Sequence, residues 1–127
     1  MIVAGIGCKR GTASEDIVSL ILAELASSGI ARENLDAIAT EASKADERGI
    51  LDAARSLSVR LIRCSLEELD QVADQVMTRS SRVQALKGVP SIAEASALVA
   101  AGRNAKLLGA RVAAEKVTCA IAIGEGS

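Results

Sequence analysis

Histidine, phenylalanine, tyrosine and tryptophan are all absent from this chain of 127 residues. Without histidine, neither a Ser-His-Asp triad nor a Cys-His pair can form, so two common routes to nucleophilic catalysis are excluded. Without aromatic side chains, the core must be built from Ile, Leu, Val and Ala. Single-stranded nucleic acids also lose the stacking surfaces on which they usually bind.

An excess of either charge is lacking as well, because fifteen Lys and Arg face sixteen Asp and Glu, for a net charge of -1. This balance supplies no basic field for duplex phosphates, so we expect no nucleic acid partner. A zinc site would have to use cysteine and carboxylates only. Cys8, Cys64 and Cys119 lie too far apart to provide the usual close ligand pairs. We therefore expect no metal and no cofactor.

Long apolar runs are missing too, and none approaches the roughly eighteen residues that a membrane span needs. The start of the chain, 1–7, has no basic region and is typical of a strand rather than of a secretory leader. Three cysteines without a pattern predict free thiols and a cytoplasmic protein. Half of the residues are hydrophobic and only one is proline, which indicates one globular domain spanning 1–127.

Short apolar runs alternate with helical periodicities along most of the chain. The runs at 2–6, 37–40 and 59–62 predict buried strands, and apolar residues at helical spacing follow each of them, over 17–25, 50–57 and 69–76. Such strand-helix units predict parallel strands joined by right-handed crossovers, with helices on both sheet faces. The segments 106–112 and 117–123, separated by 113–116, predict an antiparallel hairpin.

Three pairs of residues have the capping-box spacing that marks a helix start: Thr12 with Glu15, Ser65 with Glu68, and Ser91 with Glu94. Ser14 is a second candidate for the first cap. The alanine-rich helix after Ser91 is expected to stop at Gly102. An apolar patch at 83–86 that ends in Gly88-Val89-Pro90 stays ambiguous. The predicted fold class is α/β, a single three-layer domain with parallel strands from βαβ units and a C-terminal antiparallel hairpin.

Ligands of open parallel sheets bind beyond the carboxyl ends of the strands. This rule selects the loops 7–11, 41–47 and 64–65, with the turn 88–91 as a possible fourth wall. In the first loop, Lys9 and Arg10 lie beside the free amides of a helix start, which favours a bound anion. The alternative is that the glycines only make a tight turn and the two cations are solvated.

Other features of these loops are less specific. The glycine spacing at 5, 7 and 11 differs from the dinucleotide fingerprint, and no Walker sequence is present, so a nucleotide is not favoured. Cys8 precedes a helix next to two cations, which predicts a lowered thiol pKa and a possible nucleophile. Its alternative role is that of a small residue packed under the loop. Cys64 and Cys119 are expected in the core, and Lys44 is expected to face the crevice.

Four segments together resemble the CobE / CbiG C-terminal domain family of cobalamin biosynthesis. They are Gly5-Ile6-Gly7-Cys8-Lys9-Arg10-Gly11, Lys44-Ala45-Asp46-Glu47-x-Gly49, Gly88-Val89-Pro90-Ser91-x-Ala93-Glu94-Ala95 and Val117-Thr118-x-Ala120-Ile121-Ala122. They stand in the family's order and span nearly the whole chain. Gly109-Ala110-Arg111 departs from the pattern, since a Pro-Lys pair is expected there and only a cation remains.

The resemblance implies a role in building the corrin ring. CbiG proteins open a lactone of a cobalt-precorrin and release acetaldehyde, but they carry an additional N-terminal domain. A chain without that domain is most similar to stand-alone CobE, for which binding of a corrin intermediate is implied. Corrin intermediates are flat, apolar at the centre and fringed with carboxylates. The residues expected to bind such a tetrapyrrole are Gly7, Cys8, Lys9, Arg10, Gly11, Lys44, Glu47, Ser65 and Ser91.

Two functions remain open. In the first, the chain holds a polycarboxylate precorrin or corrin intermediate of the aerobic pathway and passes it to other cobalamin-pathway enzymes. In the second, it is a lactone hydrolase acting on an intermediate like cobalt-precorrin-5A, in which Glu41 or Glu47 activates water and the cationic loop stabilises the oxyanion. Cys8, Glu41 and Glu47 are the candidate catalytic residues. The first function is favoured, because no residue pair has the acid-base character that hydrolysis usually needs.

Overall fold

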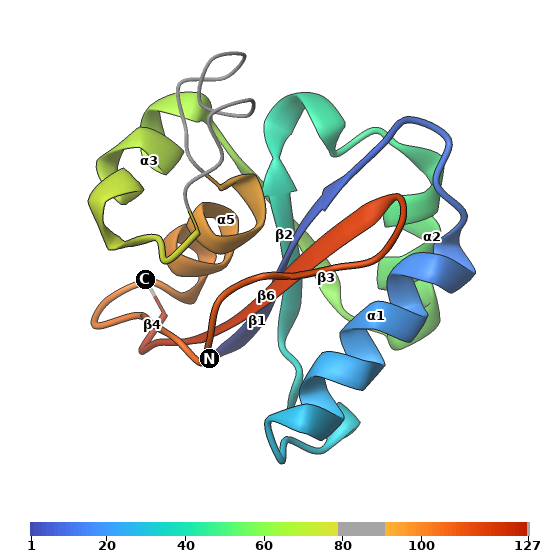
Figure 1. Cartoon of the computed structure of the whole chain (residues 1–127), viewed down its shortest axis with the longest axis horizontal. Coiled ribbons are helices and arrows are strands. Elements are labelled where there is room, and N and C mark those ends of the chain that lie inside the picture. Colours follow the sequence, from blue (N-terminus) through green and yellow to red (C-terminus); the bar gives the residue numbers. More distant parts are fainter. Residues whose placement is uncertain (79–90, 127) are drawn as a thin grey trace.

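A mixed six-stranded sheet in the order β3-β2-β1-β6-β4 forms the middle layer of the molecule, with β5 also paired to β6 (Figure 1). The computed structural model describes residues 1–78 and 91–126. The strands are β1 (Ile2–Cys8), β2 (Ala37–Glu41), β3 (Arg60–Cys64), β4 (Lys106–Leu107), β5 (Val112–Ala113) and β6 (Val117–Ile123). The predicted α/β class is confirmed, and the ambiguous stretch 83–90 lies outside the described residues.

The parallel half of the sheet consists of β1, β2 and β3, as the strand-helix units predicted. Helices α1 (Ser14–Ser27) and α2 (Arg48–Leu57) pack side by side on one face. Helix α1 buries Ile17, Ile21 and Leu25 at helical spacing, which is the stripe that its sequence predicted. All five residues of β2 are buried, as expected for a strand covered on both faces.

The opposite face is covered by α3 (Leu66–Gln71) and α5 (Ile92–Ala101), on the other side of the sheet from α1 and α2 in Figure 1. Helix α5 lies very close to β1. A Cβ atom added to Gly5 would stand 1.9 Å from the carbonyl oxygen of Ala93 and 2.7 Å from the amide nitrogen of Ala97. Glycine in the strand and alanine in the helix therefore allow the two backbones to pack in direct contact.

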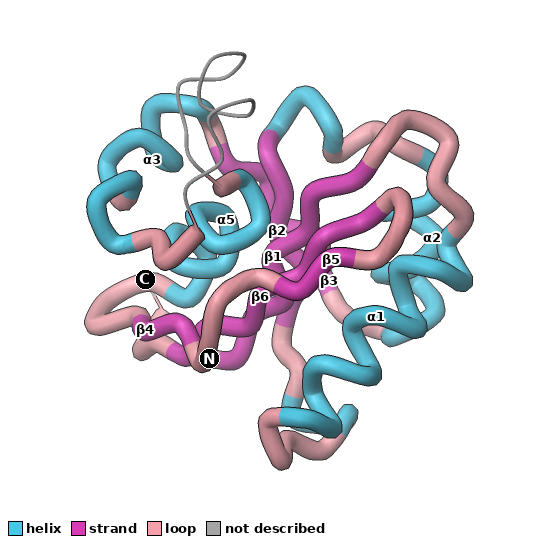
Figure 2. The backbone as a smooth tube through the Cα atoms, in the orientation of Figure 1, coloured by secondary structure: helices cyan, strands magenta, loops and turns pink. Residues whose placement is uncertain are grey.

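The C-terminal hairpin is antiparallel, as predicted, but its first arm is not one continuous strand (Figure 2). Leu107 pairs with Ala122 in β4, and Val112 pairs with Cys119 in β5, so the register slips between the two short strands. Such a slip is a bulge, which bends an edge strand and interrupts its pairing. The interruption falls at the segment Gly109-Ala110-Arg111, where the sequence departs from the family pattern.

The three predicted capping boxes have three different outcomes. The box at Ser65 is confirmed, since its hydroxyl accepts the Glu68 amide at 3.1 Å and the Glu68 carboxylate accepts the Ser65 amide at 2.8 Å. The box at Ser91 is half formed, because its hydroxyl accepts the Glu94 amide at 3.4 Å while the Glu94 carboxylate binds elsewhere.

The box at Thr12 is wrong. The residue before α1 is Ala13, and within the described chain it makes no side-chain cap. The Thr12 hydroxyl instead donates to the carbonyl of Lys9 at 2.6 Å and approaches that of Lys116 at 3.3 Å. Ser14 is the first residue of the helix rather than its cap, and its hydroxyl donates to Glu15. The segment before α1 is thus tied to Lys116, the residue before β6, and the amides of Ser14 and Glu15 have no acceptor in the described chain.

Candidate functional site

The loops expected to bind a ligand leave the sheet at one edge. The parallel strands β1, β2 and β3 end at Cys8, Glu41 and Cys64, and Glu41 stands opposite Cys64 in the register. Strand β6 runs the other way, so its first residue, Val117, lies opposite Cys8. We call the residues Lys9–Thr12, Ala42–Glu47, Ser65 and Lys116 the carboxyl-end rim.

The first loop of this rim contacts the residue before β6 and the start of α2, the helix that follows the second loop. The Lys9 amide donates to the carbonyl of Lys116 at 2.9 Å, which ties the glycine loop to the start of β6. A Cβ added to Gly49, in the first turn of α2, would stand 2.1 Å from the carbonyl oxygen of Thr12. The backbones after β1 and after β2 therefore meet on the α1/α2 side of the sheet.

Cys8 lies half-buried beneath this junction. Burial raises the pKa of its thiol, the Glu47 carboxylate raises it further, and Lys44 together with a Thr12 hydrogen bond partly offsets the rise. The predicted lowering of this pKa is therefore wrong. Lys9 and Arg10 are exposed and project from the loop, whereas burial dominates at the sulfur. The thiol form prevails at neutral pH, which makes Cys8 a poor nucleophile.

The two candidate carboxylates differ in their surroundings. Glu41 is 5% exposed and its carboxylate accepts the Ser43 amide at 2.6 Å as well as the Ser43 hydroxyl, which closes the short helix η2 (Ala42–Lys44). Glu47 is half-buried at the position preceding α2, near Cys8, and caps no amide of the described chain. Glu47 is therefore better placed than Glu41 to act on a bound molecule.

The cationic and glycine residues of the first loop are open to solvent. Lys9, Arg10 and Gly11 are exposed, and Gly11 has a φ of 79°, a left-handed conformation that favours glycine. Within residues 1–78 and 91–126, the amides of Arg10 and Gly11 have no hydrogen-bond acceptor. Lys44 is half-buried and close enough to Cys8 to affect its pKa. Amide donors without an acceptor and cationic side chains thus occur together in the first loop.

The remaining predicted residues lie on the α3/α5 side or deeper. Gly7 is half-buried on the side of β1 that faces α5, where a Cβ would stand 2.9 Å from the Thr118 hydroxyl. Ser65 and Ser91 both cap helices, and Ser91 is fully buried, so its hydroxyl does not reach the surface. The Gly88–Pro90 part of the expected fourth wall lies outside the described residues.

Cys64 and Cys119 belong to the core, as predicted. Both are fully buried, and all three cysteines are free thiols. Burial raises the pKa of Cys64 to about 12 and also raises that of Cys119. In residues 1–78 and 91–126, no three cysteine, aspartate or glutamate side chains gather as a metal site, and no helix has the length and apolarity to cross a bilayer.

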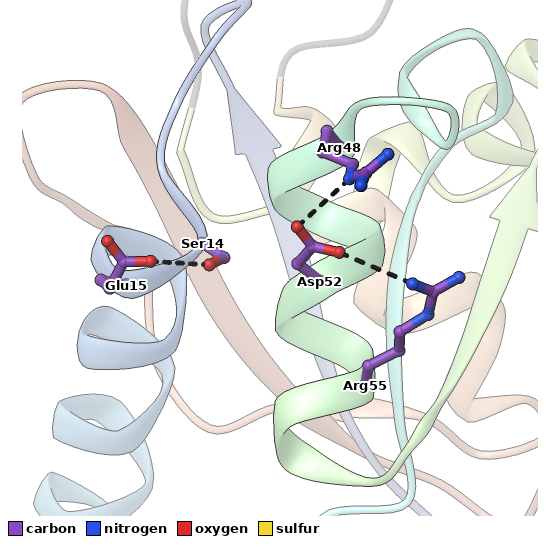
Figure 3. Close-up of polar contacts among 5 residues, drawn as sticks. All are labelled: Ser14, Glu15, Arg48, Asp52 and Arg55. Atoms are coloured by element: carbon purple, nitrogen blue, oxygen red, sulfur yellow. Dashed lines mark hydrogen bonds and ion pairs between the residues drawn. The ribbon is translucent and has the colours of Figure 1, made fainter.

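Sequence reasoning missed three contributors to the rim. Thr12 and Thr118 tie the glycine loop and β6 together, since the Thr118 hydroxyl donates to the carbonyl of Gly7 at 3.2 Å. Arg48, in the first turn of α2, adds a cation beside the start of α1 (Figure 3). Its Nε lies 3.4 Å from Asp52, whose other oxygen lies 3.8 Å from Arg55. Thr118 stands in the last of the four segments that resemble the family.

Two hollows of the described surface lie largely outside the rim, and Lys116 is the rim residue that lines one of them. Both run between α1 and the C-terminal hairpin. The first, of about 470 Å³, is lined by Asp16, Leu20, Ala23 and Glu115 among others and includes Lys116; the second is lined by Glu24, Leu108, Val112 and Ile121 among others. Lys9, Arg10 and Lys44 line neither of them.

Sheet order and rim together define an α/β domain in which the loops after the parallel strands lie at one end of the sheet. The family described as "Cobalamin synthesis G C-terminus" matches residues 2–122, and the chain belongs to it. Among curated relatives, Protein CobE of Sinorhizobium sp is 33% identical over 95% of this chain and 79% of its own length. Cobalt-precorrin-5A hydrolase of Priestia megaterium is 27% identical over 79% of this chain, but this match covers only 26% of the hydrolase.

Solved structures show the same relationship. A crystal structure of CobE, a protein from the cobalamin biosynthetic pathway, has a TM-score of 0.93 and 30% identity, over 100% of this chain and 92% of that one. Cobalamin biosynthesis protein chiG of Agrobacterium tumefaciens is 40% identical with a TM-score of 0.78, over 98% and 99%. A cobalamin biosynthesis protein G homolog of Sulfolobus solfataricus is 29% identical with a TM-score of 0.73, over 98% and 37%. The chain is thus a cobalamin biosynthesis protein of the CobE/CbiG C-terminal family.

Proposed function

We propose that this protein binds a polycarboxylate precorrin or corrin intermediate at the carboxyl-end rim and serves as a binding or carrier module. The observation that carries the proposal is the junction of the two loops, where the starts of α1 and α2 lack side-chain caps in the described structure. Each uncapped helix start leaves amide donors and a partial positive charge. Both starts lie on the same face of the sheet and next to the exposed cations.

The charges of the rim suit the fringe of such a ligand. Lys9, Arg10 and Lys44 stand on the two loops, and Arg48 and Lys116 flank them. A corrin intermediate presents several carboxylates around one flat ring, so one molecule can engage several of these cations at once. Hydrogen bonds between an ionised carboxylate and Lys or Arg are stronger than neutral ones. Because Lys9, Arg10 and Gly11 are exposed, a ligand bound to them can also be released to a following enzyme.

The hydrolase function is the alternative, and the similarity to cobalt-precorrin-5A hydrolase favours testing it. In this function Glu47 would activate a water molecule, and the cations of the rim would stabilise the oxyanion that forms when the lactone opens. Glu41 is less suitable because it is buried and already accepts both the amide and the hydroxyl of Ser43. The high pKa of Cys8 does not favour covalent catalysis.

Titration with cobyrinic acid, a polycarboxylate corrin, tests the binding function. The protein has no Tyr or Trp, so pigment absorbance that co-elutes with it from gel filtration belongs to the ligand. Replacing both Lys9 and Arg10 with alanine should weaken binding about tenfold to a hundredfold, because charge-assisted hydrogen bonds are lost. The matched control removes two exposed arginines elsewhere, Arg55 and Arg60.

The outcomes separate the two functions. Co-elution of unchanged pigment that is lost in the Lys9/Arg10 variant and kept in the control supports the carrier. Release of acetaldehyde from a cobalt-precorrin-5A substrate, abolished by Glu47→Gln, supports the hydrolase. Equal affinity of the Lys9/Arg10 variant and the unmodified protein would place the ligand elsewhere and contradict the proposal.

A further inference from the structure

Glu94, the third residue of α5, is a fully buried carboxylate outside the proposed site. Its Oε1 accepts the amides of Met77 at 2.9 Å and Thr78 at 2.8 Å. Its Oε2 accepts the Thr78 hydroxyl at 2.9 Å and the amide of Arg111 at 2.7 Å. No Lys or Arg within 1–78 and 91–126 forms an ion pair with it. Its partners in the described structure are therefore three backbone amides and one hydroxyl.

Glu68 shows that this arrangement is not what the sequence pattern requires. Both glutamates stand three residues after a capping serine, and both serines accept the amide of their glutamate. The exposed Glu68 returns to its own cap, as a capping box predicts. Glu94 instead reaches two segments that are each 17 residues away along the chain, at Met77 and Arg111. Its carboxylate joins three parts of the fold.

The first turn of α5 borders the strand that carries the glycine loop. A Cβ added to Gly7 would stand 3.9 Å from Cβ of Ile92, the first residue of the helix. We propose that Glu94 is a positioning residue, the internal anion that fastens Met77, Thr78 and Arg111 to the first turn of α5 and so holds that turn against Gly7. The effect on ligand affinity rests on the proposed function, whereas the fastening itself does not.

Amide hydrogen exchange in the ligand-free protein tests the fastening. Glu94→Ala removes every acceptor, so exchange at the amides of Met77, Thr78 and Arg111 should accelerate at least about tenfold. Glu94→Gln keeps one oxygen and should accelerate exchange only at the amides that lose their acceptor. Glu94→Gln also serves as the test variant if Glu94→Ala does not fold. The matched control, Glu68→Ala, should leave all three amides unchanged.

Chemical rescue distinguishes an anion from a side chain that merely fills space. Acetate should enter the space left in Glu94→Ala and slow exchange at the three amides, whereas chloride at equal concentration should not. Unchanged exchange in both Glu94 variants, or equal effects of acetate and chloride, would overturn the proposal.

Cobyrinic acid binding then tests the link to the rim. Glu94→Gln should lower the affinity several-fold, while Glu33→Ala, which removes an exposed glutamate before the amino end of β2, keeps it. Faster exchange in Glu94→Gln with unaltered affinity would overturn the role in holding the α5 turn beside the site. Failure of the unmodified protein to bind cobyrinic acid would count against the proposed function, and the exchange result would still decide the fastening.

Discussion

The helices on the two faces of the sheet differ in their N-terminal capping. Helices α3 and α5 each start with a serine, Ser65 or Ser91, whose hydroxyl accepts a backbone amide of the first turn. Helices α1 and α2 start after Ala13 and Glu47, which cap no amide within the part of the chain that the structure describes. A cap stabilises a helix by about 1 kcal/mol. The α1/α2 face lacks this stability on the side where the cations gather, which suits donors kept free for a ligand.

The largest expected effect concerns the tight contact on the α5 face. Gly5→Ala should lower the free energy of unfolding by about 3 kcal/mol, because the new Cβ meets backbone atoms of Ala93 and Ala97 that cannot move aside. Urea unfolding measures the change. Gly109→Ala is the matched control, since a Cβ there meets nothing within 4 Å. Equal stability of the two variants would show that α5 does not depend on its close approach to β1.

Supplying the missing cap on the other face should raise stability and reduce binding. Ala13 has the extended conformation that an N-cap needs, with φ -70° and ψ 144°, so Ala13→Ser should stabilise α1 by about 1 kcal/mol. The added hydroxyl occupies an amide proposed to face the ligand, so affinity for cobyrinic acid should fall several-fold. Ala31→Ser places the same group before η1 (Arg32–Asn34) in the same conformation, and should leave the affinity unchanged. An Ala13→Ser protein that binds as tightly as before would contradict the comparison.

Removing an existing cap should have an effect of similar size and opposite sign. Ser65→Ala deletes one half of a complete capping box and should lower the free energy of unfolding by about 1 kcal/mol. Ser14→Ala should change it by only a few tenths of a kcal/mol, because that hydroxyl contacts only the exposed Glu15 (Figure 3). Urea unfolding of both variants is the measurement, and a larger loss for Ser14→Ala would reverse the assignment of the caps.

The smallest effect is expected at the Cys8 thiol. Glu47 raises its pKa and Lys44 lowers it, so Glu47→Gln should increase the thiolate fraction at pH 8 and Lys44→Ala should decrease it. The rate of alkylation by iodoacetamide should follow, by a few-fold in each direction, and rise with pH in every variant. Mass spectrometry of the Cys8 peptide measures it. The buried Cys64 and Cys119 serve as internal controls, because they should stay unlabelled while the protein is folded.

Sequence patterns predicted the fold well where the signal is local. The strand expected at 37–40 is found at Ala37–Glu41, one residue longer. The strand expected at 59–62 is found at Arg60–Cys64. Apolar periodicity placed α1 and α2 correctly, because the same spacing that buries a helix stripe is visible in the sequence. The strand expected over 106–112 is broken, since a bulge depends on pairing with β6 rather than on the composition of the segment itself.

The candidate site was predicted less completely, for a related reason. Strands β1 and β2 are parallel, and Thr12, after the loop 7–11, lies against Gly49 of the helix that follows the loop 41–47. The role of Thr12 was missed because its second partner, Lys116, is 104 residues away. The sign of the Cys8 pKa shift was missed because neighbours in the sequence predicted a cationic environment, whereas burial and Glu47 dominate in the folded chain. Tertiary contacts of this kind leave no local pattern.

The contact between Gly49 and Thr12 has a mechanical consequence. No side chain separates the first turn of α2 from the carbonyl of Thr12, so the start of α2 and the segment before α1 pack backbone against backbone. A ligand that displaces Thr12 toward α2 must therefore also displace Gly49. The starts of α1 and α2, which are separate in the sequence, would therefore move together when a ligand binds. A substitution in either segment would affect the position of the other.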